Sequence, residues 1–150
     1  MQLQELTGAP LIGPAAPDQK LLEQLAVQAM SFRLPSCPSF TPRYVHDGEQ
    51  LELIEGLGCE VLFTPGHTPG GVCFYFAGQQ LLLSGDTLFA GSVGRTDFPG
   101  GNTQDLLKSI KTRLYTLPPA TRVLSGHGPD TTIAEEIEHN PFTSGRLQMF

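Results

Sequence analysis

The sequence predicts an α/β fold in which a sheet is flanked by helices. Short β-rich runs separated by glycine-containing turns fill residues 51–84, which is the pattern of a meandering sheet. Apolar residues at helical spacing occur both before and after this region. The chain has 150 residues, of which 39% are hydrophobic, a size suited to one core. We therefore expect residues 1–150 to form a single domain.

The first part of the chain is predicted to be mainly helical. Residues 1–6 are typical of the end of an amphipathic helix that Gly8 stops, and residues 10–13 are expected to form a short strand. Asp18 is expected to cap the next helix. Three prolines predict an irregular segment at residues 34–42. The apolar side of the helix after Asp18 is predicted to comprise Leu21, Leu22, Leu25, Ala29 and Met30.

Strands dominate from residue 50 onward, and helices follow them. A helix is expected to begin at Asn102 or Thr103, with its apolar residues toward the core. Thr132 and Glu135 form a T-x-x-E capping box for a last helix that ends near residue 140. The predicted strands are residues 51–54, 59–63, 72–76, 81–84 and 122–125.

Composition excludes several partners. Nine basic and fifteen acidic residues give a formal charge of -6, with no cluster of Lys or Arg, so a nucleic-acid partner is not expected. No apolar stretch approaches the ~20 residues that span a bilayer, so we expect no membrane partner. Cys37, Cys59 and Cys73 form no C-x-x-C pair, which indicates reduced thiols and a cytoplasmic protein.

Three motifs each place one potential metal ligand in a turn beside a predicted strand. They contain His67, Asp86 and His127, in the sequences T-P-G-H-T-P-G, S-G-D-T-L-F and S-G-H-G-P. Two imidazoles and a carboxylate suit a borderline metal such as zinc. A carboxylate at the end of a buried strand is also costly unless it is paired or bound to metal. The three motifs together therefore favour a metal site.

Each ligand candidate also has a simpler interpretation when it is taken alone. His67 would be a loop histidine with one hydrogen bond, Asp86 would cap a turn through Thr87, and His127 would serve a turn or a helix dipole. None of these interpretations explains why the other two motifs are present.

Three further residues that could bind metal are predicted not to do so. His46 reads as part of a solvated turn, and His139 is expected to end the last helix. Cys73, on a predicted strand, is interpreted as a small core residue.

The motifs G-H-T-P-G, G-D-T-L-F, G-R-T-D-F-P and G-H-G-P resemble the metallo-β-lactamase superfamily, and its glyoxalase II branch in particular. The resemblance runs over residues 1–150 and implies an αββα sandwich of two sheets between helical layers. The superfamily's T-H-x-H-x-D-H motif is not in this sequence. The resemblance therefore implies a C-terminal portion of the fold that lacks much of the N-terminal sheet. We expect uncovered apolar sheet surface, which favours self-association.

The resemblance also implies roles for the ligand candidates. Asp86 would bridge two divalent metals as the catalytic residue, His67 would bind the first and His127 the second. Zinc is expected, with iron or manganese as alternatives. The implied reaction is hydrolysis of a small-molecule thioester such as hydroxyacylglutathione by a metal-bound hydroxide. Each metal would receive two side chains from this chain, fewer than the usual three, so the chain alone could be inactive.

Arg95 lies in the G-R-T-D-F sequence, which resembles the family loop that borders the substrate. It could hold a substrate carboxylate through its forked donors. The alternative is a turn pair between Arg95 and Asp97 of small energetic value. This loop departs from the aromatic-bearing glyoxalase II version, and no separate helical C-terminal domain follows it in the sequence. Strict specificity for glutathione thioesters is therefore not implied.

Two other functions stay open at this point. A persulfide dioxygenase-like enzyme with a single iron would share the G-R-T-D-F loop. A noncatalytic remnant would bind metal weakly or act only as a partner surface. A nuclease of the same superfamily is disfavoured by the acidic balance of the chain.

Overall fold

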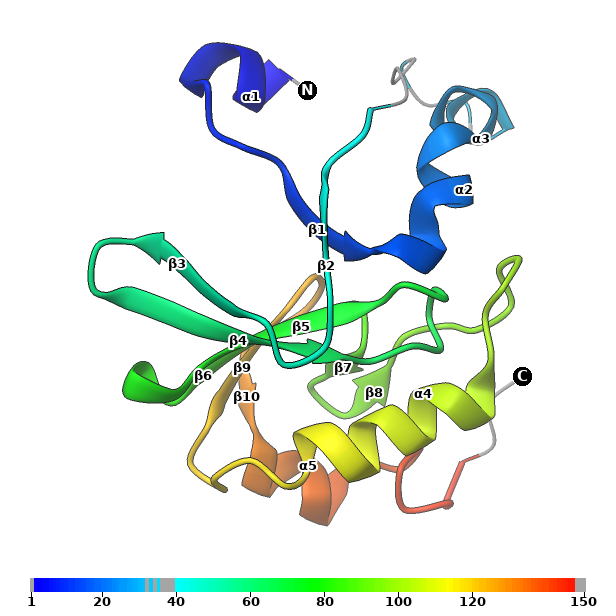
Figure 1. The fold of residues 1–150 in the computed structure, drawn as a ribbon. Helices are drawn as coiled ribbons and strands as arrows, with labels where there is room; N and C mark the ends of the chain where they lie inside the picture. Colours follow the sequence, from blue (N-terminus) through cyan, green and yellow to red (C-terminus); the bar gives the residue numbers. More distant parts are fainter. Residues whose placement is uncertain (1, 32, 34, 36–39, 148–150) are drawn as a thin grey trace.

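The computed structural model describes residues 2–31, 33, 35 and 40–147, and a six-stranded sheet lies at its centre (Figure 1). The strand order is β10-β9-β6-β5-β4-β3. Neighbours are antiparallel except for β6 and β9, which are parallel. The strands are β3 (Gln50–Ile54), β4 (Leu57–Phe63), β5 (Val72–Phe76), β6 (Leu81–Gly85), β9 (Arg122–Ser125) and β10 (Thr131–Thr132).

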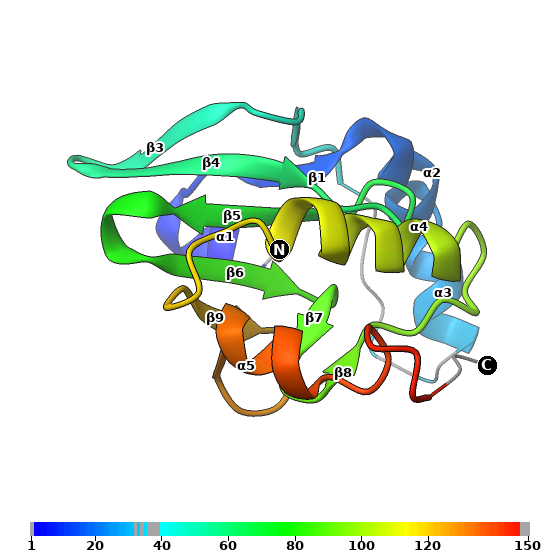
Figure 2. The same cartoon turned by 90° about the horizontal axis from the view of Figure 1, so that it is seen from below.

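One face of this sheet, called here the helix-covered face, packs against α4 (Thr103–Ser109), its π-helical continuation η3 (Ile110–Leu114) and α5 (Ile133–His139). Figure 2 shows α4 and α5 in front of the sheet on this side. The core between these layers is closed, because its central side chains have no solvent exposure. They include Cys73, Leu82, Leu106, Ile110, Leu114, Val123 and Ile133.

The opposite face, called the outer face, carries a second, smaller layer (Figure 1). Its two-stranded parallel sheet consists of β1 (Ile12–Ala15) and β2 (Arg43–Val45). The expected order of helices, sheet, sheet and helices is therefore present, with two strands in the second sheet of the described residues. The helical pieces of this layer are α1 (Gln2–Thr7), η1 (Ala16–Asp18), α2 (Gln19–Glu23) and α3 (Leu25–Ser31).

Two small elements complete the described fold. A hairpin of β7 (Leu88–Phe89) and β8 (Ser92–Val93) follows β6, and the short helix η2 (Ala77–Gln79) joins β5 to β6. Among the described residues, no helix combines the length and the hydropathy that crossing a membrane requires.

Most predicted elements from residue 50 onward are confirmed. Strands β5 and β9 have the predicted bounds. Asn102 caps α4, since its side chain accepts from the backbone N–H groups of Gln104 and Asp105. The capping box of α5 is only half formed: Thr132 accepts from the Glu135 N–H at 3.2 Å, whereas the Glu135 carboxylate pairs with His139.

Asp18 does not cap the following helix, so this prediction was wrong. The residue ends a 3₁₀ turn with φ −83° and ψ 0°, which is not the extended conformation of an N-cap, and its side chain makes no cap hydrogen bond. Instead, the buried carboxylate accepts from Thr68 Oγ1 at 2.7 Å and from the Gly70 N–H at 2.5 Å. Asp18 therefore ties the outer layer to the loop that carries His67.

The single helix expected after Asp18 is two short helices instead. Gln24 separates them, because its N–H donates to the carbonyls of Leu21 and Leu22. Of the residues predicted to share the apolar side of this helix, Ala29 is buried, whereas Met30 is 70% exposed. The predicted strand at residues 10–13 begins two residues later, and β2 was not predicted.

Several sequence predictions fall wholly or partly outside the described residues. Within the segment expected to be irregular, residues 35 and 40–42 hold no helix or strand. Residues 34 and 36–39, including Cys37, lie outside the described residues, as does Met1.

Candidate functional site

The three ligand candidates meet at one edge of the six-stranded sheet. Because β4 and β6 are both antiparallel to β5, and β9 is parallel to β6, strands β4, β6 and β9 all end at this edge. His67 lies in the loop after β4, Asp86 directly after β6, and His127 two residues after β9. The strand order thus gathers residues that are far apart in the sequence.

Asp86 is the central member of this group. Its Oδ2 lies 3.7 Å from Nε2 of His67 and 3.4 Å from Nε2 of His127. Both separations exceed the 2.7–3.2 Å of a normal hydrogen bond. The side chain of His67 is 20% exposed and that of His127 is 75% exposed, so one imidazole is enclosed and the other is open to solvent.

The ring orientation of His67 is set by a backbone carbonyl. Its Nδ1 lies 2.7 Å from the carbonyl oxygen of Arg95. Because a carbonyl oxygen only accepts, Nδ1 carries the proton, and Nε2 of the neutral ring keeps its lone pair. This is the usual arrangement of a metal-binding histidine, whose second nitrogen donates to a carbonyl or carboxylate.

Two glycines allow the backbone to approach Asp86. A Cβ at Gly126 would lie 2.3 Å from Oδ1 of Asp86, and a Cβ at Gly94 would lie 1.8 Å from its backbone oxygen. A side chain at either position would therefore displace the carboxylate or the loop that holds it. Glycine at these two positions thus permits the close approach of neighbouring segments to Asp86.

Buried hydroxyl groups connect the turns that carry His67 and Asp86. Thr64 Oγ1 lies 3.4 Å from Thr87 Oγ1 and 3.3 Å from Sγ of Cys73. Ser84 Oγ donates to the carbonyl of Leu88 at 2.8 Å. These contacts hold the end of β4 against the end of β6.

Two hollows are each lined in part by His67 and Asp86. The first has a volume of about 350 Å³. Its aromatic walls contact the imidazoles edge-on: Phe98 lies 5.7 Å from the ring of His67, and Phe89 lies 5.9 Å from that of His127. The second hollow has a volume of about 280 Å³ and reaches into the outer layer at Pro14. The aromatic residues of this site were not singled out from the sequence.

Arg95 borders the larger hollow but already has a partner. Its Nε and Nη2 donate to the two carboxylate oxygens of Asp97 at 2.6 and 2.5 Å, and its guanidinium lies 4.3 Å from the centre of the Phe98 ring. The hydrogen bonds from Arg95 lower the pKa of Asp97 to about 2. A substrate carboxylate at Arg95 would have to share this cation with Asp97 or replace it.

The residues predicted not to bind metal lie apart from this group. His46 is 80% exposed and faces Glu49, and His139 pairs with Glu135 at 3.2 Å on the surface of α5. Cys73 is fully buried in the core, and burial raises the pKa of its thiol. Cys59 is likewise buried as a free thiol.

The donor set of the described residues is incomplete as a closed metal site. No group of three His, Cys, Asp or Glu side chains in the described part of the chain converges on a single point. What the chain offers is two imidazoles on either side of one carboxylate oxygen.

Comparison with known proteins identifies the family. The profile described as the metallo-beta-lactamase superfamily matches residues 1–127. The chain therefore belongs to the metallo-β-lactamase superfamily, as the motifs predicted, and this is a superfamily of metallo-hydrolases.

Individual relatives support the same conclusion. The chain is 39% identical over 148 residues to hydroxyacylglutathione hydrolase GloC of Haemophilus influenzae, an alignment that covers 97% of this chain and 69% of that protein.

Two solved structures are also similar. The crystal structure of BLEG-1 B3 metallo-β-lactamase matches with a TM-score of 0.86 and 35% identity, covering 96% of this chain and 69% of that one. That of TTHA1623 in a di-iron-bound form matches with a TM-score of 0.84 and 40% identity, covering 93% and 68%.

Proposed function

We propose that His67, Asp86 and His127 are metal ligands of a hydrolase site that cleaves small-molecule thioesters of the hydroxyacylglutathione class. The observation that carries this proposal is the placement of two imidazole Nε2 atoms beside the same carboxylate oxygen. The identity to a hydroxyacylglutathione hydrolase supports the choice of substrate class.

The residues fit a metal by their chemistry. When the ring is neutral, the lone pair of Nε2 of His67 faces a carboxylate oxygen, and a cation between the two would turn this repulsive contact into an attractive one. Two ligands of a tetrahedral zinc, each about 2.0–2.2 Å from the ion, lie about 3.4 Å apart. The observed separations from Asp86 Oδ2 are 3.7 and 3.4 Å. Asp86 would thus be shared between one ion at His67 and a second at His127.

The choice of metal follows from the ligand types. Imidazole and carboxylate ligands suit zinc, and also iron and manganese. We propose zinc, with the other two metals as alternatives. Two side chains per ion is fewer than the three of most catalytic zinc sites, so further ligands would have to complete each shell.

The chain's own residues would prepare the site for an acyl substrate. Bound divalent ions lower the pKa of water and polarise an acyl carbonyl. The Arg95 carbonyl fixes the ring of His67, and the rings of Phe89 and Phe98 form apolar walls that limit water around the acyl group. Arg95 would contact a carboxylate of the substrate in competition with Asp97.

Metal stoichiometry tests the ligand assignment first. The purified chain would be equilibrated in separate samples with zinc, manganese and iron(II), beside the variants His67→Ala and His46→Ala. We expect bound metal in the wild type and in the exposed control His46→Ala, and its loss in His67→Ala. Weak, substoichiometric metal binding that is the same in the wild type and in His67→Ala would instead favour the noncatalytic interpretation.

Turnover then tests the reaction. A metal-loaded chain that cleaves hydroxyacylglutathione, with loss of cleavage in Asp86→Asn, would support the thioesterase. The G-R-T-D-F loop also favours a persulfide dioxygenase-like function with a single iron as the second candidate. One iron per chain together with oxygen uptake on a persulfide, and no thioester cleavage, would select that alternative.

A further inference from the structure

Glu136 is a buried carboxylate to which the proposed chemistry gives no role. It lies in α5, and only 1% of it is exposed. Burying a carboxylate is costly unless hydrogen bonds replace its hydration. None of the ion pairs formed by the described residues includes Glu136, so its compensation must come from uncharged donors.

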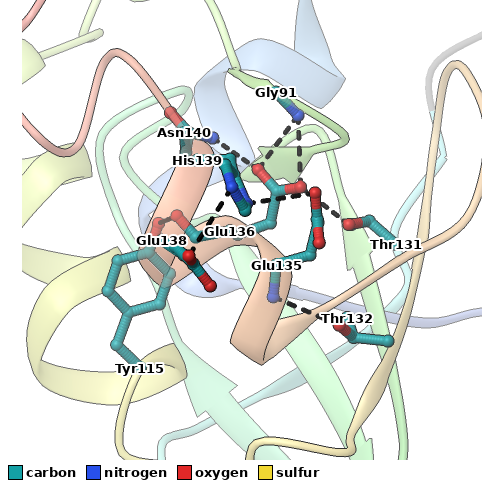
Figure 3. Close-up of polar contacts among 9 residues, drawn as sticks. All are labelled: Gly91, Tyr115, Thr131, Thr132, Glu135, Glu136, Glu138, His139 and Asn140. Atoms are coloured by element: carbon teal, nitrogen blue, oxygen red, sulfur yellow. Dashed lines mark hydrogen bonds and ion pairs between the residues drawn. The ribbon is translucent and has the colours of Figure 1, made fainter.

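Three groups surround this carboxylate, and all of them are donors. The Gly91 N–H lies 3.2 Å from Oε1 and 3.0 Å from Oε2. Thr131 Oγ1 donates to Oε1 at 2.7 Å, and Asn140 Nδ2 donates to Oε2 at 2.7 Å. Figure 3 shows Gly91, Thr131 and Asn140 gathered around Glu136 from three different segments of the chain.

Asn140 extends the same network to Ser92, the first residue of β8. Its side chain is fully buried, and Nδ2 also donates to the carbonyl of Ser92 at 3.0 Å. Its Oδ1 accepts from the N–H groups of Phe142 and Thr143, which fixes the orientation of the amide. Glu136 and Asn140 together, called here the α5 clamp, therefore hold the turn of the β7–β8 hairpin at an N–H and at a C=O.

The clamped hairpin connects the parts of the candidate site. Asp86 lies two residues before β7, and Arg95, whose carbonyl orients His67, lies two residues after β8. The base of the hairpin is closed by the Gly94 N–H, which donates to the carbonyl of Thr87 at 3.3 Å. The third donor, Thr131, follows the loop that carries His127.

We propose that Glu136 is a positioning residue of the site: through the α5 clamp it fixes the hairpin and thereby the placement of Asp86 relative to His67 and His127. The proposal rests on the proposed function insofar as these three residues bind metal. The contacts of the α5 clamp reach the hairpin at Gly91 and Ser92, and Thr131 links the same carboxylate to the segment that follows the His127 loop. A residue serving only the stability of α5 would not need contacts to these other segments.

Glu136→Gln is the informative variant, and Glu135→Gln is its matched control. An ionised Glu136 only accepts, whereas a glutamine would place an NH₂ donor against the donors that surround it. Glu135 is the preceding residue of the same helix, but its side chain is 61% exposed and faces His139. The two variants therefore make the same chemical change inside and outside the clamp.

The first readout needs no metal. Amide hydrogen exchange would be measured by NMR on the metal-free protein. We expect exchange of the Gly91 amide to become about tenfold faster or more in Glu136→Gln, because a hydrogen bond to a charged group is lost. Glu135→Gln should leave it unchanged. Equal acceleration at Gly91 and throughout α4 would mean global destabilisation and would overturn the proposal.

The second readout is metal affinity, measured by competition with a chelator. Supporting residues beyond the ligands typically change metal affinity 10–100-fold, and we expect a loss of about tenfold in Glu136→Gln. Leu51→Ala, in the core cluster on the outer face that contains no hairpin residue, serves as a destabilised control. If affinity falls no further in Glu136→Gln than in Leu51→Ala at equal stability, Glu136 has only a structural role.

The two readouts separate the two proposals. Absence of metal binding in the wild type would contradict the proposed function, while exchange at Gly91 would still decide whether the clamp holds the hairpin. Faster exchange at Gly91 without a change in metal affinity would contradict the proposal that Glu136 positions the metal ligands. If Glu136→Gln does not fold, Thr131→Val replaces it, because this variant removes one donor from the same carboxylate. The same two measurements apply, and we expect smaller changes in exchange at Gly91 and in metal affinity.

Discussion

The two faces of the six-stranded sheet are closed to different degrees. On the helix-covered face, Leu82 is fully buried beneath α4 and α5. On the outer face, its neighbours in β6, Leu81 and Leu83, are only partly buried. Alternate residues of one strand therefore meet a complete layer on one side and a sparse layer on the other. We infer that the helix-covered face supplies most of the stability.

The outer layer contributes something else, because it reaches the candidate site. Asp18 belongs to this layer, and its carboxylate holds Thr68 and Gly70 on either side of Pro69. From the helix-covered side, the α5 clamp makes polar contacts to the β7–β8 hairpin, which follows Asp86. The candidate site thus lies at the sheet edge where both layers contribute polar contacts.

A comparison of Leu82→Ala with Leu83→Ala tests most directly whether the two faces of the sheet differ in how well they are closed. We expect Leu82→Ala to lower the free energy of unfolding by about 3–4 kcal/mol, because it opens a cavity in a closed core. Leu83→Ala should cost about 1 kcal/mol, since its side chain keeps water contact in the folded state. Urea denaturation followed by circular dichroism measures both, and equal losses would show that the two faces are equally closed.

Asp18→Asn tests the link between the outer layer and the His67 loop. An asparagine would turn an NH₂ toward one of two donors, so we expect a loss of about 2 kcal/mol in the free energy of unfolding. Glu23→Gln, an exposed change in the same layer, should have little effect. The same denaturation experiment measures both variants, and similar values for the two would remove Asp18 from its supporting role.

Asn102→Ala tests the start of the helix that closes the opposite face. Its side chain accepts from two free N–H groups at the beginning of α4, so we expect a loss of about 1 kcal/mol. Asn102→Asp keeps an acceptor there and should stay close to wild type. Thermal unfolding of the two variants provides the measurement; a loss in Asn102→Asp as large as in Asn102→Ala would contradict the capping explanation.

Arg95→Ala should have the smallest effect on stability, because Arg95 and Asp97 are both exposed at the sheet edge. In the wild type the lowered pKa of Asp97, about 2 against a usual 3.8, means that the pair stabilises the fold above about pH 4. This contribution is lost as the pH falls toward 2. Carboxyl-carbon NMR should show the pKa of Asp97 return toward 3.8 in Arg95→Ala. An unchanged titration would mean that Arg95 does not cause the shift.

The sequence by itself determined the features that depend on near neighbours. Short β-rich runs predicted β5 and β9 at their observed bounds, and Asn102 and Thr132 marked the starts of α4 and α5. These signals act within a few residues, so they can be read along the chain. The motifs around His67, Asp86 and His127 also predicted the family, since their residues are close together in the sequence. One signal was overlooked, since Glu136 and Asn140 share a helical face with the buried Ile133.

Only the tertiary structure decided which distant groups meet. Asp18 was interpreted as a local cap, yet its partner Gly70 lies 52 residues away. Glu136 receives the Gly91 N–H from 45 residues away. The two imidazoles reach the same oxygen of Asp86 because of strand order and direction. A buried carboxylate must find its donors wherever the packed layers bring them, and no local pattern encodes that distance.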